Sequence, residues 1–308
     1  MLSFGYWTTN FVEVQRAMAS NSLSSARKAP IIGSFPKMFV PFITILPGMI
    51  AAVLVTEIAK TKAGEAVPGG ASGDVKFNDS LLFLMRDVLP NGLLGLAITG
   101  LMAAFMAGMA ANISAFNTVL SYDLWETYIV KERDDDYYLR IGRLATVAAT
   151  VIAIFTAELA SNFSNIMDYL QTLFGFFNAP LFATFILGMF WKRMTPAAGW
   201  IGLASGTLAA VTTAILCEDT LGSLSVGVIP LSGQGASFVA ASVAFVVDIG
   251  ISVAVSLVTV PKPASELKGL VYALTPIPHD KNLPWHKQPG TLAIIVLTLT
   301  VVLNLIFW

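Results

Sequence analysis

Long stretches without any charged residue constrain the fold of this chain more than any other feature. They cover 38–56, 88–122, 144–157, 169–191, 194–217, 220–247 and 288–308. A helix of about 20 apolar residues crosses the hydrocarbon core of a bilayer, and most of these stretches reach that length. Charged residues make up only 12% of the chain, whereas soluble proteins carry about 25%. The sequence therefore predicts an all-α polytopic membrane protein.

These stretches predict one partial helix and seven full spans within a single transmembrane domain, 1–308. Residues 1–17 are apolar and aromatic but too few to cross, so we expect part of a helix there, in a chain that is the carboxyl-terminal portion of a longer protein. A Gly- and Ser-rich loop, 222–235, precedes the sixth span. The expected spans cover about 29–58, 91–115, 140–159, 166–191, 195–217, 236–260 and 289–308.

Basic residues gather on one side of the alternating spans, which sets the expected orientation. The richer set of loops holds Arg16, Arg27, Lys28, Lys131, Arg133, Arg140, Arg143, Lys192, Arg193, Lys262, Lys268, Lys281 and Lys287. The opposite side holds Lys60, Lys62, Lys76 and Arg86. The positive-inside rule places the richer set in the cytoplasm and the carboxyl terminus outside. The outer loop, 60–90, is Gly-rich and then shows a short helical pattern, so we expect a flexible cover there.

Composition and motifs exclude several classes of protein. The net charge of −1 argues against nucleic-acid binding, and the lone Cys217 excludes an intrachain disulfide. Two histidines and one cysteine leave too few ligands for a structural zinc site. No motif for a catalytic nucleophile, a P-loop or a metalloprotease is present, so we expect neither an enzyme nor an organic cofactor.

Lys37 is the first polar residue inside an apolar stretch, where such residues are costly and often functional. It lies between Pro36 and Pro41, which interrupt a helix and leave backbone carbonyls able to meet an ammonium group or a substrate hydroxyl. The alternative is that Lys37 extends its side chain toward the basic cytoplasmic loop. Position alone supports both interpretations equally.

Gln171 lies one turn inside the fourth span, on the same helical face as Asp168. Gly175, Asn178 and Pro180 follow, a Gly/Pro interruption of the kind that exposes backbone in transporters. We favour a helix cap for Asp168 and a contact with substrate for Gln171.

Asp248, near the middle of the sixth span, suggests a proton relay. Its span contains no other ionisable residue, so we favour a structural hydrogen bond and keep the relay as the alternative. The second span is rich in small residues, which favours close helix packing. A cation site built from its carbonyls with Asn112 or Ser114 is the sharper hypothesis.

Several short motifs follow one another in a fixed order along nearly the whole chain. They are Tyr6-Trp7, Gln15-Arg16, Ser34-Phe-Pro-Lys37, Pro47-Gly-Met-Ile50, Asp168-Tyr-Leu-Gln171 and Phe190-Trp-Lys-Arg193, with Gly199 and Gly202. This series resembles the sodium/solute symporter family, most closely its sodium/sugar cotransporter branch. The resemblance implies the second half of a five-plus-five inverted-repeat (LeuT-like) bundle, starting in the sixth core helix and followed by three peripheral helices.

The resemblance also implies roles for individual residues. Tyr6 matches the inner-gate tyrosine that stacks over the sugar, and Ser3 matches a position that often holds an amide. Lys37 and Gln171 match the lysine and glutamine that hydrogen-bond sugar hydroxyls, which favours the binding interpretation of Lys37. Several donors without a demand for a counter-charge suit a neutral polyhydroxylated ligand.

The sequence departs from the family at the sodium site. The family places two adjacent hydroxyl residues on its eighth core helix, and here Ala107 and Gly108 match them, with Ala104 at the carbonyl ligand. A shifted register gives Ala110 and Ala111 instead. Sodium coupling would then need backbone oxygens, Asn112, Ser114 or water.

The resemblance implies cation-coupled symport, with sodium as the coupling ion, of a sugar or similar polar solute by alternating access. The expected partners are this solute, the cation and the bilayer, in a multi-pass protein of the plasma (inner) membrane. Because the hydroxyl pair is missing, a solute sensor or an uncoupled facilitator is the alternative. Proton coupling through Asp248 also stays open.

Overall fold

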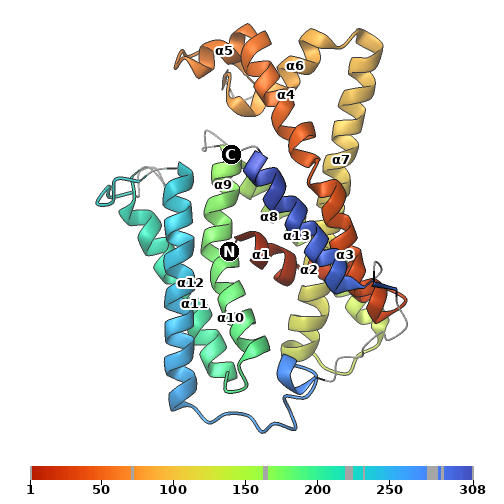
Figure 1. The fold of residues 1–308 in the computed structure, drawn as a ribbon, viewed down its shortest axis with the longest axis vertical. Coiled ribbons are helices and arrows are strands. Elements are labelled where there is room, and N and C mark those ends of the chain that lie inside the picture. Colours follow the sequence, from red (N-terminus) through yellow and green to blue (C-terminus); the bar gives the residue numbers. More distant parts are fainter. Residues whose placement is uncertain are drawn as a thin grey trace. The chain divides into compact units, whose positions relative to one another are not determined.

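A computed structural model describes residues 2–70, 73–161, 166–218, 225–231, 233–275, 284–285 and 288–306. Most of these residues are helical, and a two-stranded antiparallel pair, β1 (Pro68–Gly70) and β2 (Gly73–Asp74), is the one sheet in the described ranges. The α-helices are α1 Leu2–Thr9, α2 Phe11–Met18, α3 Leu23–Lys37, α4 Val40–Leu54, α5 Thr56–Lys62, α6 Ser80–Val88, α7 Asn91–Thr118, α8 Asp135–Ser161, α9 Ile166–Leu173, α10 Ala179–Phe190, α11 Pro196–Leu216, α12 Gly233–Val258 and α13 Pro289–Ile306. Figure 1 labels these α-helices, and two π-helices, η2 (Val119–Ile129) and η3 (Phe174–Asn178), continue α7 and α9.

Within the described residues, seven helical segments are long and apolar enough to cross a membrane. They are Leu23–Leu54, Asn91–Ile129, Asp135–Glu158, Ile166–Phe190, Pro196–Leu216, Gly233–Val258 and Pro289–Ile306. The predicted class, an all-α polytopic membrane protein, is confirmed. Where the sequence suggested one partial helix over 1–17, the structure has α1 and α2, which are separated at Asn10 because its side chain accepts a hydrogen bond from the Val12 N–H (3.0 Å).

The described chain forms two compact units. The first comprises Met1–Arg27 and Met167–Thr291, and the second comprises Lys28–Ile166 and Leu292–Trp308. In the first unit, α10, α11, α12 and η3 pack against one another, and α1 packs against α10 and η3. In the second, α7 packs against α8, and α4 packs against α5 and α6.

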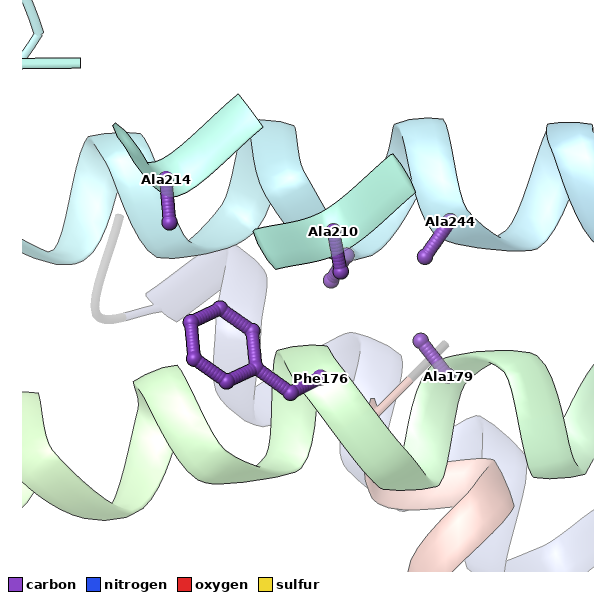
Figure 2. Close-up of a cluster of buried hydrophobic side chains, with 6 residues drawn as sticks. Phe176, Ala179, Ala210, Ala214 and Ala244 are labelled. Atoms are coloured by element: carbon purple, nitrogen blue, oxygen red, sulfur yellow. The ribbon is translucent and has the colours of Figure 1, made fainter. Parts of the chain in front are cut away.

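The core of the first unit is a cluster of small side chains around one aromatic ring. Figure 2 shows Phe176 of η3 and Ala179 of α10 directed toward alanines of α11 and α12. The cluster contains Phe176, Ala179, Ala210, Ala214, Ala241 and Ala244. Because alanine projects little beyond the backbone, the helices approach closely, which is how helices associate where lipid removes the hydrophobic driving force.

Small buried residues recur every four positions on both α11 and α12. The row on α11 is Ala198, Gly202, Gly206, Ala210 and Ala214, and that on α12 is Ala236, Ala240, Ala244, Asp248, Ser252 and Ser256. Residues four apart share one helical face, so the two rows form the contact between the helices. A Cβ at Gly206 would lie 3.0 Å from the Ala244 carbonyl oxygen, which shows how near the backbones come.

The segment 56–88 of the second unit, where the sequence suggested a flexible cover, has a small apolar core. Its core is a buried cluster of Ala51, Val55, Ile58 and Val75. The Asp79 carboxylate accepts a hydrogen bond from the Lys76 N–H (2.9 Å) and fixes the start of the following helical turn. Apolar residues of the loop therefore fold back onto α4 and α5, which the Gly-rich composition of the loop did not reveal.

An ion pair joins α5 to α6 in the segment 56–88. Arg86 lies 3.0 Å from Glu57 and 2.7 Å from Asp87, and its guanidinium covers the Phe83 ring at 4.5 Å. A hydrogen bond from its own backbone and one from Arg86 lower the pKa of the Glu57 carboxyl. Hydrogen bonds to Asp87 and Glu57 raise the pKa of Arg86. Both partners are solvent-exposed, so the pair adds little stability.

Candidate functional site

The first membrane span is interrupted next to Lys37. Helix α3 ends at Lys37 and α4 begins at Val40. Pro36 and Pro41 have no N–H, so the carbonyls four residues before them cannot accept the usual helical bond. The predicted interruption is therefore present, and it places the exposed Lys37 side chain at the end of a helix.

The fourth span is interrupted as well, by the π-helix η3 between α9 and α10. Gly175, Asn178 and Pro180 lie in or directly after this turn, where the sequence indicated a break in the helix. A Cβ at Gly175 would lie 3.3 Å from the Ser237 carbonyl oxygen, so the glycine lets α12 pack against the turn. Single π turns in α-helices occur frequently at functional sites.

Tyr6 and Gln171 contribute to the same part of the first unit. The Tyr6 ring lies 5.8 Å from the Phe174 ring, measured between centroids. Gln171 precedes Phe174 by three positions, so the two side chains are neighbours on the helix surface. Gln171 is half-buried. An amide and two aromatic rings therefore lie around the start of the π turn.

Helix α1 is held against this turn by polar and close contacts. Thr9 Oγ1 donates a hydrogen bond to the Gly5 carbonyl (2.7 Å) and lies 3.3 Å from Asn178 Oδ1, and a Cβ at Gly5 would lie 3.1 Å from that Asn178 oxygen. Ser3 belongs to α1, but its side chain lies outside the described part of the chain. Lys37 belongs to the second unit, whereas Tyr6 and Gln171 belong to the first.

The candidate ion residues lie together on α7 in the second unit. Ala104, Ala107, Gly108 and Asn112 are all exposed. The Asn112 side-chain amide donates a hydrogen bond to the Gly108 carbonyl (2.9 Å), so this side chain already serves its own helix. The four residues present no hydroxyl, and hard cations prefer oxygen ligands. This set of residues fits sodium poorly.

Asp248 is fully buried, and two hydroxyl groups bind its carboxylate. Thr184 of α10 donates to Oδ2 (2.9 Å) and Ser252 of α12 donates to Oδ1 (2.9 Å). Ser252 Oγ also lies 3.2 Å from the Ala198 carbonyl oxygen of α11. The carboxylate therefore joins α12 to α10, and Ser252 brings the pair against α11, which agrees with the favoured structural interpretation and supplies the partner that the sequence did not name.

A second buried polar contact joins α9 to α12. The hydroxyls of Thr172 and Ser237 lie 3.0 Å apart, and these residues are 4% and 1% exposed. Thr172 directly follows Gln171 in the chain. Burying a polar group without a hydrogen-bond partner costs free energy, so this pair of hydroxyls favours one arrangement of the two helices.

Comparison with known proteins decides the family. The sequence profile of the sodium:solute symporter family matches residues 1–206, which include all the candidate solute and ion residues. This chain belongs to the sodium:solute symporter family. The resemblance carried by the short motifs is confirmed.

Curated relatives in this symporter family are sodium-coupled cotransporters. The sodium/glucose cotransporter of Vibrio parahaemolyticus is 29% identical over 209 residues, which are 65% of this chain and 37% of that protein. Sodium/glucose cotransporter 4 of Danio rerio is 27% identical over 306 residues, 94% of this chain and 46% of the relative. Sodium/myo-inositol cotransporter 2 of Mus musculus is 28% identical over 221 residues, which are 70% of this chain and 32% of that protein. The chain spans less than half the length of these relatives.

The sequence did not indicate two of the polar pairs of this chain. Neither Thr184, the partner of Asp248, nor the Thr172 and Ser237 pair was singled out. The four-residue repeat of small residues on α11 and α12 was a usable signal, because Asp248 falls within the repeat and must then face a neighbouring helix. Which residue of that helix it meets depends on register, which spacing within one helix does not give.

Proposed function

We propose that this protein carries a sugar, or a polar solute of similar size, across the membrane together with a cation, sodium being the coupling ion. Membership of the sodium:solute symporter family and the cotransporter names of the relatives support this proposal. Its bundle is then the second half of a five-plus-five inverted repeat in one transmembrane domain, which alternates access to the solute from the two sides of the plasma membrane.

The observation that carries the solute site is the grouping of Tyr6, Phe174 and Gln171 at the π turn. An amide offers two donors and an acceptor, which suits neighbouring hydroxyls of a sugar, and aromatic rings cover the apolar face of such a ligand. The match of Lys37 and Ser3 to solute-binding positions of the family extends the proposal to these two residues. Ser3, Tyr6, Lys37 and Gln171 bind solute in our proposal.

A second function, solute sensing or facilitated transport without ion coupling, is favoured by one observation. Ala107 and Gly108 offer no side-chain oxygen on α7, and the Asn112 amide is bonded to the Gly108 carbonyl. In a symporter the cation would then depend on the Ala104 carbonyl, the Asn112 side-chain oxygen, other backbone oxygens or water. A facilitator needs no such ligands.

Solute uptake by cells or proteoliposomes that contain the whole product of the gene distinguishes these functions. Symport predicts accumulation of labelled sugar above the external concentration under an inward sodium gradient, and loss of accumulation when the gradient is collapsed. A facilitator equilibrates the sugar regardless of the gradient. The proposed site predicts that Lys37→Ala reduces uptake, so uptake unchanged by this substitution removes Lys37 from the site.

A further inference from the structure

Two polar contacts fasten the interrupted fourth span to α12, one on each side of the π turn. Before the turn, Thr172 of α9 meets Ser237 (3.0 Å between hydroxyl oxygens). After the turn, Thr184 of α10 meets Asp248 (2.9 Å). Between them, Phe176 and Ala179 pack into the alanine cluster (Figure 2). Helix α12 therefore supports both halves of this span.

The π turn keeps both contacts in register. Thr172 and Thr184 are twelve positions apart, whereas Ser237 and Asp248 are eleven apart on α12, which is an uninterrupted α-helix. If the fourth span were a regular α-helix parallel to α12, its one extra residue would turn the second threonine about 100° away from α12, and one of the two contacts would be lost. A π turn closes bonds from residue i to i+5 and so accommodates one additional residue. The segment Phe174–Asn178 supplies that turn.

The distances around the pair before the turn favour one donor direction. Thr172 Oγ1 donates to the Asp168 carbonyl (2.8 Å), and a hydroxyl has one proton to donate. Ser237 Oγ lies 3.0 Å from Thr172 Oγ1 and 3.3 Å from the Gly233 carbonyl oxygen, so the shorter distances favour donation from Ser237 to Thr172. This chain of two hydroxyls ends on a backbone carbonyl of α9, so it holds the rotation of that helix relative to α12.

Gln171 and Thr172 are consecutive, so their side chains point about 100° apart around the helix. When Thr172 is held against α12, the direction of Gln171 is set with it. Thus we propose that Ser237 and Thr172 are positioning residues for the solute, acting through Gln171. This inference rests on the proposed function, because it assumes that Gln171 binds solute.

The test is a double-mutant cycle on solute uptake by the whole gene product. Thr172→Val removes the hydroxyl with little change in shape, and we expect the apparent KM to rise roughly three- to tenfold, as for loss of one buried hydrogen bond. The maximal rate, corrected for the amount of protein in the membrane, should stay within about twofold, since the positioning acts on binding. Thr172→Ser should restore the KM, and Ser237→Ala should reproduce the defect.

The decisive arm places Thr172→Val in a Gln171→Ala background. If Thr172 acts through Gln171, no further rise in KM follows there. A further rise of the same size in that background overturns the proposal, as does an unchanged KM in Thr172→Val alone. If Gln171→Ala itself leaves the KM unchanged, the solute site is wrong and this inference fails with it. An effect of Gln171→Ala without one of Thr172→Val refutes only the positioning role.

Thr213→Val is the matched control. Thr213 is a buried threonine of the same unit, 8% exposed, and its hydroxyl donates to the Ala209 carbonyl of its own helix (2.8 Å). Its substitution removes a buried hydroxyl without touching α9, so we expect no change in KM. A KM raised equally by Thr213→Val and Thr172→Val would show a general packing effect and would overturn the proposal.

Discussion

Gly202 of α11 lies so close to Asp248 of α12 that a Cβ at position 202 would come within 2.7 Å of the carboxylate Oδ1. The same Cβ would overlap Ser252 Oγ. The hydrogen bonds around Asp248 thus require that position 202 has no side chain. The polar cluster on α12 therefore depends on the row of small residues on α11.

The first prediction concerns this close approach. Gly202→Ala should destabilise the protein by about 1–3 kcal/mol, because the added methyl group forces α11 away from α12. The measurement is thermal unfolding in detergent. Gly250→Ala on α12 is the control: a Cβ there meets nothing within 4 Å, and alanine favours helix over glycine by about 1 kcal/mol. Equal stability of the two variants would contradict the close packing.

The second prediction separates the hydrogen bonds of Asp248 from its charge. Asp248→Leu leaves the hydroxyls of Thr184 and Ser252 without their buried partner, which should cost about 1–3 kcal/mol of stability. Asp248→Asn keeps an acceptor and the shape, so its loss should be smaller. Comparison of the two unfolding curves decides. An asparagine variant as unstable as the leucine variant would show that the carboxylate itself is required.

Much of this framework could be predicted because membrane spans leave a strong local signal. The uncharged runs indicated seven spans, and Pro36 with Pro41 indicated the break beside Lys37. The interruption after Gln171 was also visible, since glycine and proline disfavour a regular helix. Each of these features depends on residues close together in the chain.

The interhelical contacts could not be predicted in the same way. Thr172 and Ser237 are 65 positions apart, and Thr184 and Asp248 are 64 apart. Their meeting depends on the register between two helices, and the π turn shifts that register by one residue. The core of the segment 56–88 could not be predicted for a related reason. Val75 is buried in one cluster with Ile58, which the Gly-rich sequence around Val75 does not indicate.

The third prediction concerns how the local stability of the segment 56–88 depends on pH. The pKa of Glu57 is lowered in the folded chain, first by a backbone hydrogen bond and then by Arg86. Its stabilising effect is therefore present above the ordinary carboxyl pKa of about 4.3 and is lost as the pH falls through the lowered value.

Amide hydrogen exchange over 56–88 in wild type and Glu57→Gln checks this third prediction. Wild type should be slightly better protected at neutral pH, and the two proteins should converge as the solution is acidified. High salt should also reduce the difference, since the pair is exposed. A difference that grows on acidification would show that Glu57 acts with the opposite sign.

The fourth prediction adds the missing oxygen ligands on α7. The double substitution Ala107→Ser and Gly108→Ser introduces two adjacent hydroxyls where the chain has none. If these positions face the coupling cation, the sodium concentration for half-maximal uptake should fall by about tenfold or less, the effect of one or two added ligands. An unchanged sodium dependence in a well-expressed variant would place the cation elsewhere.

The concentration dependence of sugar uptake by wild type and by Gln171→Ala tests the proposed solute site at the π turn most directly. Loss of hydrogen bonds from the Gln171 amide to sugar hydroxyls should raise the apparent KM by about tenfold, or roughly 1.4 kcal/mol. The variant should reach the membrane in normal amounts, because Gln171 is only half-buried. A solute site at Gln171 predicts this rise in KM, and identical uptake curves for the two proteins would contradict such a site.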